Sequence, residues 1–334
     1  MISRRCFITG FVTGLTSLAA TASAQEYKAQ RAGRRVPLVG VLWQGEPSAS
    51  VVLRAEEAFR QGLREHGGYV EGQNIAIEWR DVQGRQEQYP EAAAELVRLK
   101  VDVIVALYVP CALAAKQATR DIPIVILAGE PVETGIVPSI ASPGGNVTGV
   151  SLMASASNGK SVELFRDMLP SVRRVGVLGH ATNPVFAKAM LDEVRLAGDP
   201  TGTEIQPVVM VRGADELESA FATFVSERVD AIVVQGSLSI KPVTDLAIKH
   251  RIPAASTPRA FAEIGGLLSF GADGPAAFRH GAKFVHRILQ GKHPKDMPIE
   301  QPTKFDLAVN LKTAKAIGLT IPEAFLLRAD AVIE

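Results

Sequence analysis

The sequence predicts an α/β protein of two similar lobes, each a parallel β-sheet with helices on both faces. Three observations lead to this fold class. Short apolar runs alternate with amphipathic segments from residue 36 onward, as strand–helix–strand units require. The order of these runs repeats in the second half of the chain. A glycine-rich segment at residues 142–151 separates the two halves.

The first half contains four predicted strands separated by helical segments. Residues 36–43 form an apolar, β-branched run that is typical of a strand buried in a parallel sheet. Apolar side chains at helical spacing follow at 51–66, and Gly67-Gly68 ends that helix. The remaining predicted elements are a half-buried strand at 74–80, a helix at 89–100, a buried strand at 101–107, a helix at 112–120 and a strand at 122–127.

The second half repeats three short sequences of the first half in the same order. Residues 174–178 (RVGVL) match 38–42 (LVGVL), 228–233 (RVDAIV) match 100–105 (KVDVIV), and 251–253 (RIP) match 121–123 (DIP). Offsets of 136, 128 and 130 residues favour a duplicated unit over chance similarity of apolar strands. Because ligands of such sheets bind beyond the carboxyl ends of the strands, we expect a binding cleft between the lobes.

The glycine-rich segment predicts a hinge at Gly144, Gly145 and Gly149, because glycine tolerates sharp bends. Residues 298–310 and a helix at 311–317 follow the second copy, so the chain must cross between the lobes more than once. Closure about such a hinge is the expected motion. We expect a first lobe of residues 36–145 joined by 273–297, and a second lobe of residues 146–272 joined by 298–334.

The first 24 residues have the composition of an export signal. Arg4 and Arg5 precede an uncharged stretch that ends with Ala22-Ser23-Ala24, the small residues that a signal peptidase requires. The paired arginines favour the twin-arginine type; a general secretory signal is the alternative. A membrane span is disfavoured because it needs about 20 apolar residues. We expect cleavage after Ala24, a flexible segment at 25–35 and a periplasmic mature protein.

Composition excludes several classes of protein. The chain has 334 residues, of which 36 are basic, 35 are acidic and 47% are hydrophobic. A disordered chain would have low hydrophobicity and high net charge, and nothing in this balance indicates nucleic-acid binding. Two cysteines cannot form a disulfide framework. Cys111, which follows the signal, is expected to be a small buried side chain rather than a reactive thiol.

The motifs that would indicate catalysis are missing from the sequence. It has no G-x-S-x-G nucleophile elbow and no G-x-x-x-x-G-K phosphate loop. Its six histidines are not spaced as metal ligands. We therefore expect no catalytic residues, no cofactor and no metal site.

Polar and aromatic residues that follow the predicted strands are the candidate ligand-binding residues, because these positions share one edge of each sheet. They are Trp43, Gln44, Glu46, Ser48, Tyr108 and Glu130 in the first copy, and Asn183, Gln235, Ser237, Thr257 and Asp273 in the second.

Several candidates have a structural alternative. Trp43 is either a flat wall for a ligand ring or a core residue. Ser48 either caps the following helix or marks a helix N-terminus that binds a ligand carboxylate. Glu130 either accepts a ligand ammonium group or faces water.

Five segments resemble one known family. They are residues 144–151 (GGNVTGVS), 265–271 (GGLLSFG), 300–305 (EQPTKF), 310–319 (NLKTAKAIGL) and 327–330 (LRAD). These segments are similar to the ABC transporter substrate-binding protein family that includes tryptophan- and tyrosine-type binding components. The resemblance extends from about residue 36 to the C-terminus. It implies a type I periplasmic-binding-protein fold, with two Rossmann-like lobes joined by a multi-crossing hinge.

The resemblance also implies a function. The protein would capture a small molecule, either an amino acid or an aromatic or carboxylate compound, in the cleft by hinge closure. It would then deliver that ligand to an ABC permease in the inner membrane, and we expect it to act as a monomer. A ligand-sensing subunit of a membrane receptor is the alternative, and a periplasmic enzyme is a third.

Overall fold

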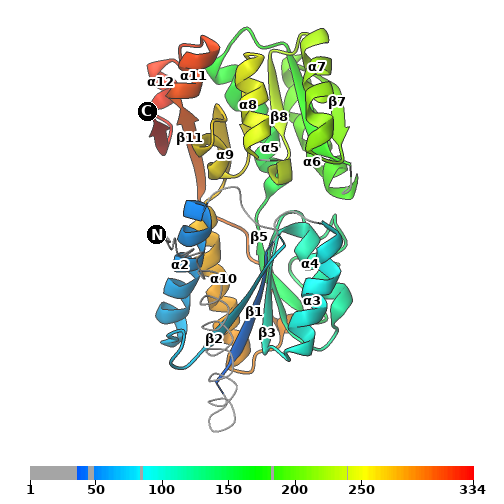
Figure 1. Ribbon diagram of the computed structural model, residues 1–334, viewed down its shortest axis with the longest axis vertical. Coiled ribbons are helices and arrows are strands. Elements are labelled where there is room, and N and C mark those ends of the chain that lie inside the picture. The colour runs from blue at the N-terminus through cyan, green and yellow to red at the C-terminus, as the bar shows by residue number, and fades with distance from the viewer. Residues whose placement is uncertain (1–35, 44–48, 83–85, 182–183, 239) are drawn as a thin grey trace, which may run out of the picture.

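The computed structural model describes residues 36–43, 49–82, 86–181, 184–238 and 240–334. Two lobes lie one above the other along the longest axis of the molecule, and each is built on its own β-sheet (Figure 1). The predicted signal at 1–24 and the segment at 25–35 lie outside the described residues.

The first lobe is a parallel sheet between two pairs of helices. Its strands have the order β2-β1-β3-β4-β5. They are β1 (Leu38–Trp43), β2 (Ala76–Asp81), β3 (Val103–Leu107), β4 (Ile124–Ala128) and β5 (Val147–Ser151). Helices α2 (Ala49–Gly67) and α10 (Gly274–Leu289) cover one face, and α3 (Tyr89–Arg98) and α4 (Tyr108–Ala118) cover the other (Figure 1).

The second lobe has a larger sheet with the order β12-β11-β10-β9-β8-β6-β7. Its strands are β6 (Arg174–His180), β7 (Glu204–Val211), β8 (Ala231–Val234), β9 (Ala254–Ser256), β10 (Leu268–Ala272), β11 (Phe305–Asn310) and β12 (Ala331–Ile333). Its helices are α5 (Ala154–Met168), α6 (Pro184–Gly198), α7 (Leu217–Ser226), α8 (Lys241–Lys249), α9 (Arg259–Glu263), α11 (Leu311–Ile317) and α12 (Glu323–Leu326).

The sequence repeat corresponds to one structural unit that occurs in both lobes. The order β2-β1-β3-β4-β5 of the first sheet recurs as β7-β6-β8-β9-β10 in the second. One repeated side chain makes the same bond in both copies. Asp102 accepts a hydrogen bond from the Leu38 N–H at 2.7 Å, and Asp230 accepts one from the Arg174 N–H at 2.8 Å. Each carboxylate thus fixes the start of the first strand of its copy, β1 or β6, to the turn before the neighbouring strand β3 or β8.

The glycines that were predicted to form the hinge lie inside the first lobe. Gly149 belongs to β5, which pairs with β4, so the first lobe extends to Ser151 rather than ending at residue 145. A Cβ on Gly149 would lie 2.2 Å from the Ile126 carbonyl oxygen, and its φ is 138°. Gly149 is therefore required by a close backbone contact within the sheet. Gly144 and Gly145 have positive φ in the loop before β5.

The chain passes between the lobes three times, at residues 152–153, at residue 273 and at residues 301–304. The third crossing begins later than residue 298. Glu300 still belongs to the first lobe, because its N–H donates to the Gly149 carbonyl and its carbonyl accepts the Ser151 N–H, both at 2.9 Å.

Two strands of the second sheet, β11 and its parallel neighbour β12, depart from the expected parallel arrangement. β11 pairs antiparallel with β10, and its first residue Phe305 lies opposite Ala272, the last residue of β10. The third crossing delivers the chain to the edge of the sheet that faces the first lobe. β11 must therefore run away from that edge, against the direction of β10.

Packing of α2 against α10 closes one face of the first sheet. Phe59 and Phe284 are fully buried there. A Cβ on Gly62 would lie 2.4 Å from the Arg279 carbonyl oxygen, so glycine is needed for this close helix approach. Across the described ranges, the helices that we find are too short or too polar to cross a membrane.

Candidate functional site

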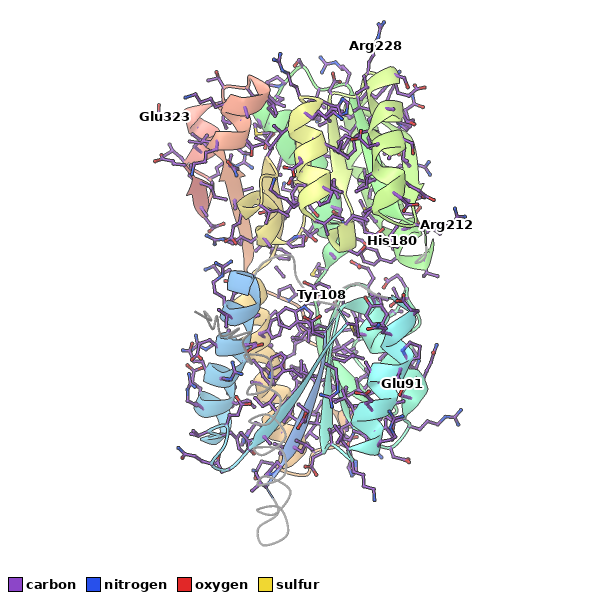
Figure 2. All side chains as sticks on the ribbon, in the orientation of Figure 1. Glu91, Tyr108, His180, Arg212, Arg228 and Glu323 are labelled. Atoms are coloured by element: carbon purple, nitrogen blue, oxygen red, sulfur yellow. The ribbon has the colours of Figure 1, made fainter. Side chains whose placement is uncertain are left out.

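A cavity of about 780 Å³ lies between the two lobes. The ends of β1, β3 and β4 border it from the first lobe, and the ends of β6, β8 and β9 border it from the second. Tyr108 and His180 lie on the edges of the two lobes that face each other (Figure 2). Known ligand pockets enclose roughly 300–1,000 Å³, so this cavity has room for a small organic molecule.

The structure brings together five of the predicted binding residues. Trp43, Tyr108, Gln235, Ser237 and Thr257 all border the cavity. Four further candidates, Gln44, Glu46, Ser48 and Asn183, lie outside the described residues.

The first-lobe wall of the cavity is largely apolar and aromatic. Leu107, Tyr108, Leu127 and Phe278 contribute to it. Trp43 is only 3% exposed, and its ring packs 5.2 Å from the ring of Phe278, centroid to centroid. Trp43 is therefore a core residue that also borders the cavity, and this wall is suited to contact with a ring or an alkyl group.

Tyr108 has a strained backbone at the junction of β3 and α4. Its φ is 65°, in the left-handed region that non-glycine residues rarely adopt. Glu130 after β4 and Met153 after β5 also have positive φ, at 38° and 49°. These positions lie at the edge of the first sheet that faces the second lobe. Such strain costs on the order of 1–3 kcal/mol for each residue and is common at ligand sites.

The second-lobe wall adds further polar groups to Arg54, Asp81 and Gln117 of the first lobe. Gln235 is 2% exposed, and its Oε1 accepts the backbone N–H of His180 at 2.7 Å. This bond fixes the orientation of the amide at the end of β8. Ser237 and Thr257 lie beside it on the same wall. Burial lowers the pKa of His180, which favours its neutral form.

Glu130 does not border the cavity, and its role differs from both predicted alternatives. Its Oε1 accepts the Ser155 N–H at 2.6 Å and thereby caps α5, the first helix of the second lobe. The Oε2 atom is buried without a hydrogen-bond partner. Burial raises the pKa of Glu130 to about 7, against the opposing effect of the Ser155 hydrogen bonds. The carboxyl group therefore ties the end of β4 to the second lobe beside the first crossing.

Asp273 is also a capping residue rather than part of the cavity wall. Its Oδ1 accepts the Ala276 N–H at 3.0 Å and so begins α10. Because Asp273 lies at the second crossing, the bond orients the helix that returns to the first lobe.

Ion pairs connect the two lobes beside the cavity. Arg54 of α2 donates to Glu263 of α9 at 2.6 Å. Arg259, also on α9, lies 3.4 Å from Glu263 and 3.1 Å from Asp306. Arg54 and Arg259 both border the cavity, so this chain of charges spans its edge.

Sequence reasoning missed part of the cavity wall. His180 is the last residue of β6, and its place at a strand end is the same signal that pointed to Asn183 three residues later. Arg54 and Phe278 lie within the helices α2 and α10 rather than at the end of a strand. The sequence therefore gave no signal that they would border the cavity. In the parts of the chain that the structure describes, we find no group of three His, Cys, Asp or Glu side chains arranged to bind a metal.

Two facing α/β lobes, three crossings and a cavity between the sheet ends define a type I periplasmic-binding-protein fold. A leucine-binding protein from Thermotoga maritima shares this fold, with a TM-score of 0.54 and 20% identity over 78% of this chain and 77% of that one. The chain belongs to the family described as ABC transporter substrate binding protein, whose model matches residues 48–333. The family resemblance of the sequence motifs is thereby confirmed, and the chain is a substrate-binding protein rather than an enzyme.

Two relatives carry names that state a ligand. A tyrosine-binding protein from Clostridioides difficile (strain R20291) is 28% identical over 271 residues, which are 80% of this chain and 77% of that protein. A domain from Streptococcus pneumonia, solved in complex with L-Trp, is 26% identical with a TM-score of 0.80. The match covers 89% of this chain and 99% of the domain.

Proposed function

We propose that this protein is the periplasmic solute receptor of an ABC importer and that it captures a small aromatic ligand between its lobes. The cavity carries this proposal, because aromatic and apolar side chains of the first lobe face polar groups of the second across it. The names of the tyrosine-binding relative and of the L-Trp complex support an aromatic ligand.

Closure of the lobes is the second part of the proposal. The lobes are joined by three short crossings and by the Arg54–Glu263 ion pair at 2.6 Å, and we propose that this pair forms as the lobes close. A ligand drives closure only by the contacts that it gains with the second lobe. The closed receptor then delivers its ligand, as a monomer, to a permease in the inner membrane after export and cleavage behind Ala24.

Thermal denaturation with a ligand panel tests the proposal. The panel contains L-tyrosine, L-tryptophan, benzoate and 4-hydroxybenzoate, with L-leucine as the non-aromatic control. A ligand at 100 times its Kd adds about 2.7 kcal/mol to the free energy of unfolding, so at least one aromatic compound should raise the Tm clearly. If L-leucine alone raises the Tm, the aromatic class is wrong.

A pair of variants locates the binding site. Leu113→Trp places a large ring on the cavity wall and should abolish the shift. Leu196→Trp makes the same change on α6, where the side chain is 65% exposed, and should preserve it. A shift that survives in Leu113→Trp would place the ligand outside the cavity.

A further inference from the structure

A buried carboxyl group joins the two lobes beside the first crossing. Glu130 follows β4 in the first lobe, and its Oε1 accepts the N–H of Ser155 in α5 of the second lobe at 2.6 Å. The backbone has a positive φ on both sides of this contact, 38° at Glu130 and 49° at Met153. Only residues 152 and 153 separate the lobes there. A rotation of one lobe against the other therefore acts directly on this contact.

The second lobe covers the end of β4. A Cβ on Gly129 would lie 3.1 Å from the Phe186 ring of α6 and 3.2 Å from the Ala154 Cβ of α5. Glu130, the next residue, is thus enclosed by two helices of the second lobe. A rotation that parts the lobes moves these helices away from β4 and admits water to the carboxyl group. Gly129, Ala154 and Phe186 also border the cavity, so this cover is continuous with the ligand site.

The surroundings of Glu130 do not stabilise a negative charge. Among the described residues, its Oε2 is buried and has no hydrogen-bond partner. The charged groups that act on it are Glu133, in the turn after β4, and Glu193 of α6, and both are carboxylates. The first charged residue of α5 is Lys160, which is paired with Glu163. A buried carboxylate without a cation is costly, whereas the same group in water ionises freely.

We propose that Glu130 couples closure of the lobes to the uptake of one proton from water, because its carboxylate becomes a carboxylic acid when the second lobe covers it. Protonation then favours the closed arrangement and retention of the ligand. Loss of the proton at higher pH favours opening and release. This inference rests on the proposed function, because it assigns the regulation of the same cavity.

The direction and the size of the effect follow from the burial of Glu130. Burial raises the pKa of its carboxyl group from 4.5 to about 7. The ratio of closed to open protein should be highest below pH 4.5 and should fall as the pH rises through about 7. In the limit in which opening restores the pKa of 4.5, the ratio falls about 70-fold between pH 5 and pH 8. Incomplete hydration in the open protein gives a smaller change, and we expect at least about 5-fold.

Distances between spin labels test the coupling without any ligand. Glu91→Cys and Arg212→Cys carry the labels, one on each lobe, at exposed positions (Figure 2). Cys111 is fully buried and should not react. In the mature chain from residue 25, the population with the shorter distance should be larger at pH 5 than at pH 8.

Two variants identify the group responsible. Glu130→Gln keeps an oxygen that can accept the Ser155 N–H but cannot ionise, so its distances should be the same at both pH values. Glu323→Gln removes an exposed carboxylate on α12 and should behave as the wild type. Thermal denaturation shows whether each variant is folded.

Titration calorimetry relates the proton to ligand binding. L-tyrosine and L-tryptophan do not change ionisation between pH 5.5 and pH 7.5, so proton uptake in this range comes from the protein. At pH 6.5, measured in two buffers of different ionisation enthalpy, Glu130→Gln should take up about 0.5 proton fewer per ligand than the wild type. This difference isolates Glu130 from His180, which also borders the cavity and titrates.

The outcomes separate this inference from the proposed function. Label distances that do not depend on pH, or that still depend on it in Glu130→Gln, would overturn the coupling. Ligand binding with equal proton uptake in the wild type and Glu130→Gln would also overturn it, while supporting the proposed function. A pH-dependent distance that is lost in Glu130→Gln, together with no binding of any compound in the earlier panel, would support the coupling and refute the aromatic ligand.

Discussion

The carboxyl group of Glu130 makes the stability of the molecule depend on pH in a direction that can be calculated. Its Oε1 caps α5 through Ser155, while its Oε2 is buried without a partner. Burial raises its pKa from 4.5 to about 7, and the nearby carboxylates of Glu133 and Glu193 act in the same direction. The folded protein therefore holds this proton at pH values at which the unfolded chain has lost it.

The sign and the size follow from these two pKa values. When folding raises the pKa of an acid, its contribution to the free energy of unfolding is fully present below the unfolded pKa near 4.5. This contribution is lost as the pH rises through the folded pKa of about 7. Between pH 5 and pH 8, the Glu130 carboxyl should lower the free energy of unfolding by about 2.5 kcal/mol. Glu130→Gln keeps an oxygen that can accept the Ser155 N–H and cannot ionise, so it should remove this loss.

Urea denaturation at several pH values from 5 to 8 measures the effect. The free energy of unfolding of Glu130→Gln, minus that of the wild type, should rise by about 2.5 kcal/mol over this range. Glu323→Gln is the control, because that side chain is exposed on α12 and is not among the charges that shift the pKa of Glu130. Its profile should stay close to that of the wild type. Parallel profiles for Glu130→Gln and the wild type would refute the assignment of a buried, protonated carboxyl.

Three further changes test other parts of the structure. Gly149→Ala places a Cβ 2.2 Å from a backbone oxygen and should cost several kcal/mol in urea denaturation, whereas Gly144→Ala meets no atom within 4 Å and should cost about 1 kcal/mol for its positive φ alone. Similar losses for both would contradict the close contact in β5. Glu263→Gln removes the charge opposite Arg54 and should weaken ligand binding by up to about 5-fold through faster dissociation. A double-mutant cycle with Arg54→Gln checks this, since additive effects would exclude a coupled pair. Trp43→Ala should lower the free energy of unfolding by about 3–5 kcal/mol because the ring is 3% exposed, and a loss of binding without a loss of stability would disprove its core role.

The sheet architecture could be predicted because its signals are local and repeated. Buried strands such as residues 38–42 require a continuous apolar run, and the Asp102 carboxylate has a counterpart 128 residues later in Asp230. The fold class of two α/β lobes was therefore correct. The orientation of β11 could not be foreseen, because it depends on where the third crossing enters the second sheet.

The site was harder to predict because a polar residue that follows a strand can either bind a ligand or cap a helix. Asp273 had a local signal, since an Asp followed by Gly-Pro is typical of a helix start. Glu130 had none, because the N–H group that it binds lies 25 residues further along the chain. Glycine content likewise cannot distinguish a bend from a close approach. Gly149 is explained only by the backbone of Ile126, which the pairing of β4 with β5 brings beside it.

The position of α10 in the chain determines the order in which the lobes can be completed during synthesis. This helix covers the face of the first sheet that contains Val39 and Val41, and it contributes the buried ring of Phe284. Its residues leave the ribosome only after the strands β6 to β10 of the second lobe. A nascent chain that ends at residue 272 therefore exposes an apolar sheet face to water. Domains usually fold in order from the N-terminus, whereas here the first lobe to emerge must wait for the second.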